Sequence, residues 1–511
     1  MSAVDLIVVA VYLIGVVWFG ARLSRRQAGF HDYFLTGRRI PWWAVMGSIV
    51  ATETSTVTLI SVPGYAFAAD LTFLQIAIGY LAGKIIIALV LIPSYFSSEL
   101  LTAYQLIAKW IGPGFGRVAA LMFLGTRTLA DGFRLFATGL VFAAVLSTLP
   151  GAVSLAACTV PGLLPSNTLL IIGVGLIGVT TLAYTLLGGM TAVIWTDVSQ
   201  LVIYLGGAAV AVVVLLTSLP GGWEEVITAG ASSDKFRLID FSLDLSRSYT
   251  FWSGLLGGAF LTCATHGTDQ MFVQRYLCSR STSDARRALV VSGFVVIVQF
   301  VLFLLIGVML WVYYTAHEPE ALLTITREGQ LQTDRVFPLF IMSHFPIGLR
   351  GLMVAAIVAA AMSTLSSSLN SSAASTIADF YIPCVTNSES DVHYLRVSRW
   401  ATIGWAVVQM TVAFIAIALS NRVVDEVLAI QSFTGGLMLG LFLIGGLAVT
   451  RSRVSIGTAL AAGAIATVAV RMLTNVSWQW YVVIGSLTIL SVNYVIERFR
   501  GNASKGNFVD A

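Results

Sequence analysis

Long apolar stretches make up most of the chain, and short polar or basic segments separate them. About thirteen of these stretches approach or exceed the roughly 20 apolar residues that a helix needs to cross a bilayer. They lie near residues 4–21, 42–67, 73–96, 117–147, 168–187, 191–218, 251–267, 288–315, 350–380, 399–420, 426–449, 455–474 and 478–496. We therefore predict an all-α polytopic membrane protein with about 13 transmembrane helices.

The composition supports this prediction. Of the 511 residues, 57% are hydrophobic and 11% are charged, whereas soluble domains carry about 25% charged residues. The first apolar stretch has Asp5 where a signal peptide would be basic, so we expect a retained helix. The expected location is the plasma or inner membrane, as a multi-pass protein surrounded by the lipid bilayer.

The basic residues predict the orientation. If the N-terminus lies outside, the inward loops and tail carry 18 Lys and Arg and the outward loops carry 7. An excess of positive charge on the cytoplasmic side favours this N-out, C-in arrangement. Of the four cysteines, only Cys158 lies in a predicted outward loop, so we expect no disulfide framework.

Nine of the fourteen residues from Ser363 to Thr376 are Ser or Thr, inside an apolar stretch. Lipid cannot satisfy hydroxyl groups, so this cluster must face protein, water or an ion. Residues 360, 363, 364, 367 and 371 share one face of a helix. Such uncharged oxygens suit a monovalent cation such as Na⁺. The alternative is helix packing, in which small residues allow close approach.

The loop charges also suggest an internal repeat. Without the first stretch, residues 42–218 form five helices that begin inside, and residues 251–449 form five that begin outside. Inverted repeats of transporters have this plan, and the first helix of each repeat is usually broken at the binding site. Polar or Gly-rich segments lie in both places, at 51–58 with Pro63-Gly64, and at 254–258 with 265–269.

This plan predicts five parts of the chain. They are an N-terminal extra helix with a basic loop (1–40), a first repeat of core helices 1–5 (41–218), an outward loop (219–250), a second repeat of core helices 6–10 (251–450), and two C-terminal helices with a short tail (451–511).

Three motifs carry a resemblance to a known family. They are Tyr184–Val193 with Gly188 and Gly189, followed by residues 195–200; Gly-Thr-Asp-Gln at 267–270 with Val-Gln-Arg at 273–275; and Ala-Ala-Met-Ser-Thr at 360–364. Together they resemble the sodium/solute symporter family, which includes sodium–glucose, sodium–proline and sodium–sialic acid cotransporters. The resemblance implies a LeuT-like core of two inverted five-helix repeats with extra helices.

The resemblance also implies ion sites. The first Na⁺ site would use the carbonyls of Ala51, Thr54 and Ala360 and the hydroxyls of Ser363 and Thr364. A second Na⁺ would bind Asp197, Ser366 and Ser367. Alternatively, Asp197 is an acid near a helix N-terminus that the helix dipole stabilises.

Candidate solute ligands line the two predicted breaks. They are Thr52, Glu53, Thr56, Thr58, Phe67 as a lid, Arg127, His266 and Gln431, while Thr265 and Phe433 are candidate gating residues. Glu53 would contact the solute, pair with Arg127, or act as a gate. Arg127, Asp131 and Arg134 have the spacing of a local ion group. In sugar-transporting relatives a Trp stands at the position of His266 and a Tyr at that of Thr265, which puts a sugar-stacking platform in doubt.

The chain has no nucleotide-binding loop, metal-ligand spacing or hydrolase motif, so we expect neither an enzyme nor a nucleic-acid partner. An ion gradient would supply the energy. We predict Na⁺-coupled import of a small polar solute, a sugar or an organic or amino acid, by alternating access. The protein would be a monomer or weak homodimer. The alternatives are a proton-coupled carrier that uses Glu53 or Asp197, and an uncoupled sensor or channel.

Overall fold

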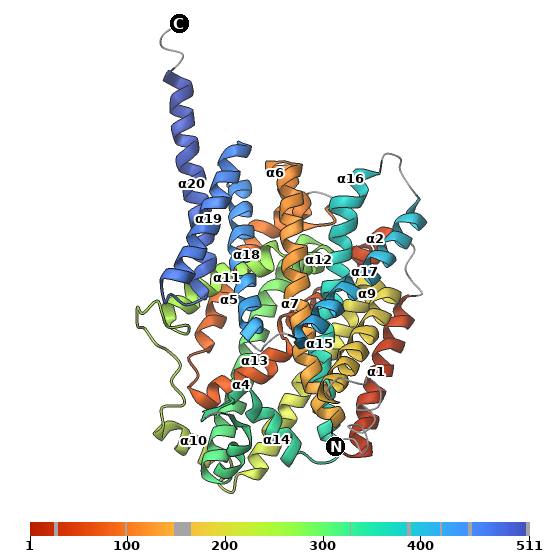
Figure 1. Ribbon diagram of the computed structural model, residues 1–511, viewed down its shortest axis with the longest axis vertical. Helices are drawn as coiled ribbons and strands as arrows, with labels where there is room; N and C mark the ends of the chain where they lie inside the picture. The colour runs from red at the N-terminus through yellow and green to blue at the C-terminus, as the bar shows by residue number, and fades with distance from the viewer. Residues whose placement is uncertain are drawn as a thin grey trace.

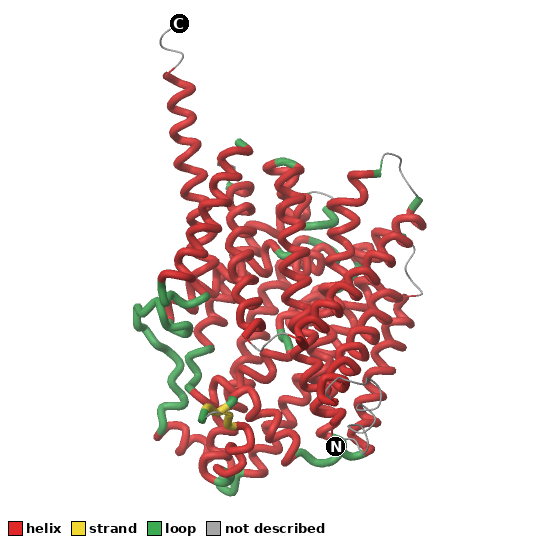
Figure 2. Tube along the Cα trace, in the orientation of Figure 1, coloured by secondary structure: helices red, strands yellow, loops and turns green. Residues whose placement is uncertain are grey.

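The computed structural model describes residues 1–24, 29–97, 100–147, 165–327, 329–385, 390–418, 422–447 and 452–506. Cys158 lies outside these residues. Nearly all of the described chain is helical, and the long helices run side by side in one bundle (Figure 2). The N-terminus lies at one end of this bundle, and the last helix projects from the opposite end (Figure 1).

The first half of the chain contains α1 (Ala3–Ser24), α2 (Phe30–Leu35), the short η1 (Thr36–Arg38), α3 (Trp42–Glu53), α4 (Thr56–Ala68), α5 (Leu74–Phe96), α6 (Ala103–Ile111), α7 (Pro113–Ser147), α9 (Pro165–Ser218) and α10 (Gly222–Ser232). The second half begins with the π-helical η2 (Ser253–Gly257), α11 (Gly258–Thr268), α12 (Gln270–Leu277) and α13 (Thr282–Ala316). It continues with η3 (Pro319–Ile325), the strands β1 (Thr326–Arg327) and β2 (Gln330–Leu331), η4 (Thr333–Arg335), α14 (Val336–His344), α15 (Leu349–Ser375), η5 (Thr376–Tyr381), α16 (Ile382–Cys384), α17 (Asp391–Ala418), α18 (Arg422–Gly446), α19 (Arg453–Leu473) and α20 (Gln479–Gly506).

Both expected helix breaks are present. Thr54 and Ser55 have extended backbones between α3 and α4, with ψ angles of 100° and 168°, and the two helices are bent by 60°. Asp269 is also extended (ψ 125°) and separates α11 from α12, where its side chain accepts a hydrogen bond from Met271 N. Pro63 does not break its helix, because α4 continues through it.

Gly189 divides α9 into two halves. With 54 residues, α9 would be about 80 Å long if straight, more than twice the roughly 30 Å apolar core of a bilayer. Gly189 interrupts it with φ 52° and ψ −151°, a conformation that glycine adopts easily. The neighbouring Gly188 has a different role. A Cβ there would lie 2.9 Å from the carbonyl oxygen of Gly20, so the missing side chain of Gly188 lets α1 pack closely against α9.

The serine-rich helix α15 lies in the middle of the bundle (Figure 1), and 23 of its 27 residues are buried. It packs against α9, α1, α7 and α17. Among the described residues, eight helices are long and apolar enough to span a membrane, or nine with the bent α3/α4 pair. The helix α7, which carries Arg127, Asp131 and Arg134, is not among them. The count of about thirteen and the orientation stay predictions.

The segment 219–250 covers the end of α4. Lys235 donates to the carbonyl oxygens of Phe67 at 2.7 Å and Ala69 at 2.8 Å, and burial lowers the pKa of its ammonium group. These carbonyls lie at the C-terminal end of α4, where they lack partners within the helix. The segment therefore caps α4 and fixes the position of Phe67.

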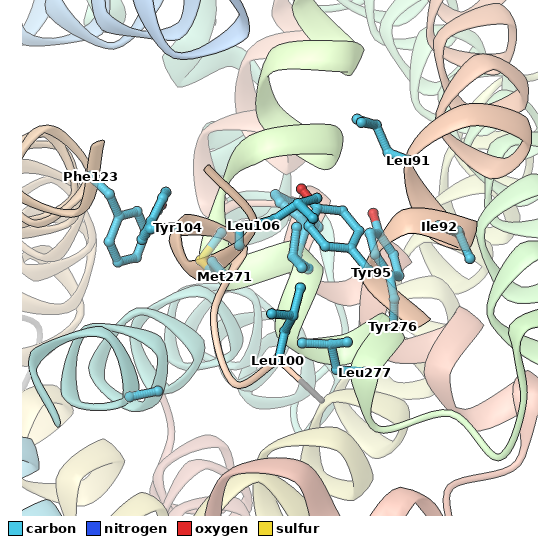
Figure 3. Close-up of a cluster of buried hydrophobic side chains, with 14 of the residues drawn as sticks. Leu91, Ile92, Tyr95, Leu100, Tyr104, Leu106, Phe123, Met271, Tyr276 and Leu277 are labelled. Carbon is cyan, nitrogen blue, oxygen red and sulfur yellow. The ribbon is translucent and has the colours of Figure 1, made fainter. Parts of the chain in front are cut away.

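A second packed region lies around α12. Met271, Tyr276 and Leu277 of α12 face Tyr95 of α5 and Tyr104 of α6 in one apolar cluster (Figure 3). Tyr95 Oη donates to the carbonyl oxygen of Gly267 at 2.6 Å. This packing holds the short α12 in place after the break at Asp269.

Candidate sodium and solute site

The hydroxyl stripe of α15 faces the unwound segment between α3 and α4. Ser363 and Thr364 are 0% and 3% exposed. Thr364 Oγ1 lies 3.5 Å from the carbonyl oxygen of Thr52 and 3.4 Å from that of Ala360. Thr56, at the start of α4, donates to the carbonyl oxygen of Ile357 at 3.1 Å. The stripe and the break, which the sequence predicted separately, therefore meet.

The five residues assigned to the first Na⁺ site are all buried: Ala51, Thr54, Ala360, Ser363 and Thr364. They offer only uncharged oxygens, and the last carbonyls of α3 have no partner within the helix. The Thr54 hydroxyl already donates to Val50 O at 2.9 Å and accepts from Gln299 at 2.7 Å. Its carbonyl is thus the group available to an ion. This donor set fits a hard monovalent cation.

Other hydroxyls of the Ser/Thr run bond within α15 or to a neighbouring helix. Ser367 donates to the carbonyl oxygen of Ser363 at 2.7 Å, and Ser371 to that of Ser367 at 2.8 Å. Gln409 of α17 donates to Ser368 Oγ at 2.8 Å. The packing interpretation therefore applies to the part of the run at Ser368, and the ion site near Thr364 stays a prediction.

Asp197 lies in α9 and is fully buried. Its Oδ1 accepts from Ser363 Oγ at 2.6 Å, and its Oδ2 accepts from Ser48 Oγ at 2.5 Å and from Arg275 Nη2 at 2.9 Å. Arg275 also lies at 0% exposure. The protein thus provides its own cation for Asp197.

One interpretation of Asp197 needs correction. Because it follows the Gly189 break by two turns, it lies beyond the first turn, where a helix dipole acts, so that interpretation is wrong. Ser366 and Ser367 both donate to the carbonyl oxygen of Ser363, at 3.1 Å and 2.7 Å, and Ser367 Oγ also meets Arg275 Nη2. Thr52 Oγ1 lies 3.4 Å from Asp197 Oδ2. The second ion site at Asp197, Ser366 and Ser367 stays a prediction.

A cavity of about 300 Å³ opens between the two helix breaks. Its lining includes the predicted residues Thr52, Glu53, Thr58, Arg127, Thr265, His266 and Gln431, together with Ser61, Val62, Phe73, Tyr80, Arg134, Leu261, Thr262, Met271, Phe272 and Phe300. The lining thus brings together most of the predicted solute ligands. Phe67 is not in it: its side chain is 4% exposed, so the lid prediction is wrong and Phe73 and Phe300 line the wall instead. Phe433 packs against the apolar cluster around α12 and also lies outside the lining.

Glu53 pairs with a residue that the sequence analysis did not consider. Lys84 of α5 is fully buried and donates to Glu53 Oε2 at 2.7 Å and to Ser292 Oγ at 3.2 Å. His266 Nε2 lies 3.4 Å from the same carboxylate oxygen. The suggested pairing of Glu53 with Arg127 is therefore wrong. A lysine within an apolar helix needs an anionic partner, and this was the signal in the sequence.

The opposite wall carries two arginines of α7. Arg127 Nε donates to Asp269 Oδ2 at 2.9 Å, and its side chain is 2% exposed. Arg134 donates to Asp131 at 2.8 Å and to Gln431 at 3.3 Å, and its side chain is 26% exposed. The predicted ion group around Asp131 is confirmed. Arg134 therefore presents more of its guanidinium to the cavity than Arg127 does.

A smaller cavity of about 20 Å³ lies between the ion region and this arginine. Thr364 and Ser55 line one part of it, and Arg134, Asp131 and Thr138 line another; Thr56, expected at the solute, also lies here. A ligand of Arg134 and an ion at Thr364 would thus act on the same few side chains.

Comparison with known proteins agrees with this geometry. The family model described as "Sodium:solute symporter family" matches residues 166–495. The sodium/sialic acid symporter NanT of Aliivibrio fischeri is 30% identical over 95% of this chain and 91% of its own length. The human sodium/iodide cotransporter is 27% identical over 84% of this chain and 63% of its own length.

A solved substrate-bound, outward-open structure of a Na⁺-coupled sialic acid symporter superposes with a TM-score of 0.81. It is 28% identical in sequence, and the match covers 97% of both chains. This likeness confirms the expected LeuT-like fold class.

The fold, the broken helices and these relatives define a multi-pass secondary transporter of the cell membrane. The chain belongs to the sodium:solute symporter family. It couples the movement of a small solute to Na⁺, as its relatives do.

Proposed function

We propose that the solute is a small organic anion that also carries hydroxyl or amino groups, and that Na⁺ drives it into the cell. Arg134 carries this proposal. Its guanidinium donates to Asp131 at 2.8 Å, its side chain is 26% exposed, and it lines the cavity of about 300 Å³. A carboxylate can accept two parallel hydrogen bonds from such a group, with the long Gln431 contact as the bond that gives way.

The opposite wall supports the hydroxyl or amino part of the solute. Glu53 Oε1 is buried and has no hydrogen-bond partner among the described residues, although Oε2 is paired with Lys84. A buried carboxylate oxygen without a donor is costly, so a donor group from the solute would satisfy it. Thr58 and Ser61 line the same wall and add hydroxyls. Sialic acid, the solute in the names of two similar symporters, has both kinds of group.

We further propose that Ala51, Thr54, Ala360, Ser363 and Thr364 hold the coupling Na⁺. This ion would join α15 to the unwound end of α3, so that the wall containing Thr52 and Glu53 takes its binding geometry only when Na⁺ is present. Na⁺ and solute must then each raise the affinity for the other. A second Na⁺ would use Asp197 with Ser366 and Ser367. The solute would leave chemically unchanged.

The alternating-access cycle would rest on the two inverted repeats, residues 41–218 and 251–450. The breaks at Thr54 and Asp269 lie on either side of the cavity, which supports this division. Thr265 lines the cavity together with His266 and would gate it.

Competition for uptake tests the solute class. Purified protein in liposomes, with Na⁺ outside and K⁺ inside, would be given labelled sialic acid and an excess of unlabelled hydroxylated carboxylates, amino acids or neutral sugars. Carboxylates should compete and neutral sugars should not. If neutral sugars compete as well as the acids do, the anionic class is wrong.

A further inference from the structure

Arg275 of α12 makes its contacts with oxygens that a second Na⁺ would also use. Its Nε donates to Ser48 Oγ at 2.8 Å. Its Nη2 meets the hydroxyls of Thr52 and Ser367 and lies 2.9 Å from Asp197 Oδ2. One guanidinium nitrogen therefore stands where oxygens from α3, α9 and α15 converge.

This nitrogen has more oxygen neighbours than protons to donate to them. Nη2 carries two protons, and three oxygens surround it. Thr52 Oγ1 lies 3.4 Å from Asp197 Oδ2 and 3.5 Å from Ser367 Oγ, so these groups bond only weakly to one another. A spherical cation contacts all three oxygens without needing protons. The cluster therefore suits a small cation as well as it suits the guanidinium.

We propose that Arg275 is a tethered competitor of the second Na⁺, because Nη2 and Na⁺ take the same position among Thr52, Asp197 and Ser367. This inference rests on the proposed function, since it requires a second Na⁺ at Asp197. All three side chains and Arg275 are at most 3% exposed, so water does not screen the two positive charges from each other. Binding of Na⁺ therefore moves the guanidinium away from Asp197.

This exchange acts on α12. Arg275 is one of its polar links to the rest of the bundle; Gln274, which donates to Phe34 O at 3.0 Å and Asn370 Oδ1 at 2.8 Å, is another. Met271 and Tyr276 of α12 also pack in the apolar cluster (Figure 3), and these contacts do not involve Arg275. Binding of Na⁺ would thus weaken the contact between α12 and α9 without detaching α12 from the bundle. Release of Na⁺ would restore the contact between Arg275 and Asp197. Arg275 is a positioning residue that links the ion to the broken helix of the second repeat.

Binding of radioactive Na⁺ to the purified full-length protein tests this role. Arg275→Gln removes the competing charge, so its Na⁺ affinity should rise at least roughly tenfold, the size of one like-charge effect on a neighbouring group. A residue with only a structural role would not give tighter binding. In Na⁺-free buffer the variant should have a lower melting temperature than the wild type, and added Na⁺ should raise its melting temperature again.

Two variants control for charge and shape. Arg275→Gln combined with Asp197→Asn removes both charges, and its Na⁺ affinity should not rise. Arg275→Lys keeps the positive charge, so its Na⁺ affinity should stay near that of the wild type. An Arg275→Gln protein that folds in high Na⁺ but binds the ion no better than the wild type overturns the proposal.

A measurement on the wild type avoids any folding defect. Hydrogen exchange across residues 270–277 should be faster in Na⁺ than in K⁺, because the ion releases α12. Equal or slower exchange in Na⁺ contradicts the proposal. Its failure is distinguishable from that of the proposed function, because Na⁺-dependent solute binding by the wild type does not depend on Arg275 leaving Asp197.

Discussion

Ser363 donates its hydroxyl proton to Asp197 over 2.6 Å, and this bond joins the two proposed ion positions. A hydroxyl has one proton and two lone pairs, so the Ser363 oxygen could still contact Na⁺ at the first proposed position. Ser363 thus bonds to Oδ1 of Asp197, while Arg275 donates to Oδ2. Occupation of either position therefore changes the electrostatics of the other.

Thr364→Ala should weaken activation by Na⁺. Thr364 Oγ1 is one of two proposed hydroxyl ligands, and its loss leaves the ion with one contact fewer. A lost hydrogen bond or ligand of this kind costs about 1–3 kcal/mol, which corresponds to a roughly five- to 150-fold higher half-saturating Na⁺ concentration. Uptake measured against Na⁺ concentration gives this value. Thr458→Ala, at an exposed position of α19, is the matched control; equal Na⁺ dependence in both variants would sink the assignment.

Arg134→Gln should raise the half-saturating concentration of the solute more than that of Na⁺. The variant removes the charge that would face the solute carboxylate, and it also leaves Asp131 with less compensation. A charged hydrogen bond is worth about 1.5–3 kcal/mol, so we expect roughly a ten- to 150-fold loss of solute affinity. Arg335→Gln, an exposed arginine of η4, should have little effect. A normal solute affinity in Arg134→Gln would exclude Arg134 as the anion ligand.

Lys84→Met should destabilise the protein strongly. It leaves the Glu53 carboxylate buried without its closest cation, and breaking a buried ion pair in this way costs about 3–5 kcal/mol. Removing both charges, with Glu53→Gln and Lys84→Met together, should recover most of the loss. Thermal unfolding of the purified proteins in detergent measures this. If the double variant melts no higher than the single one, the pair does not act as a unit.

Gly189→Ala should destabilise the turn between the halves of α9. At φ 52° and ψ −151° a side chain is strained, by roughly 1–3 kcal/mol. Gly175 lies in the same helix with a helical backbone, and nothing lies within 4 Å of the position of its missing Cβ. Gly175→Ala should therefore be neutral or slightly stabilising. Thermal unfolding compares the two variants, and a similar melting temperature for both would contradict the role of Gly189.

Composition and hydrophobic pattern predicted the helices and their breaks well. The length of an apolar stretch and the residues that interrupt a helix depend on the local sequence alone. The stretches 73–96 and 288–315 correspond to α5 and α13, and the helix breaks fall at Thr54, Gly189 and Asp269. The Ser/Thr stripe of α15 meets the first break as the resemblance implied. These features depend on residues that are close in the sequence.

The ion pairs were not predictable in the same way. Lys84 lies 31 residues from Glu53, and Asp269 lies 142 residues from Arg127. Each buried charge needs a partner, but the spacing of helices in the bundle decides which one it meets. The misplaced Phe67 has a similar cause, because segment 219–250 and Lys235 fix the end of α4 away from the cavity.

The most direct test of the central claim is the thermal shift caused by the solute in Na⁺ and in K⁺. A ligand at 100 times its Kd stabilises a protein by about 2.7 kcal/mol, which is readily measured. Because Na⁺ at Thr364 is proposed to order the wall that binds the solute, sialic acid or a similar hydroxylated carboxylate should raise the melting temperature in Na⁺ and much less in K⁺. An equal shift in both salts would contradict coupling through this site.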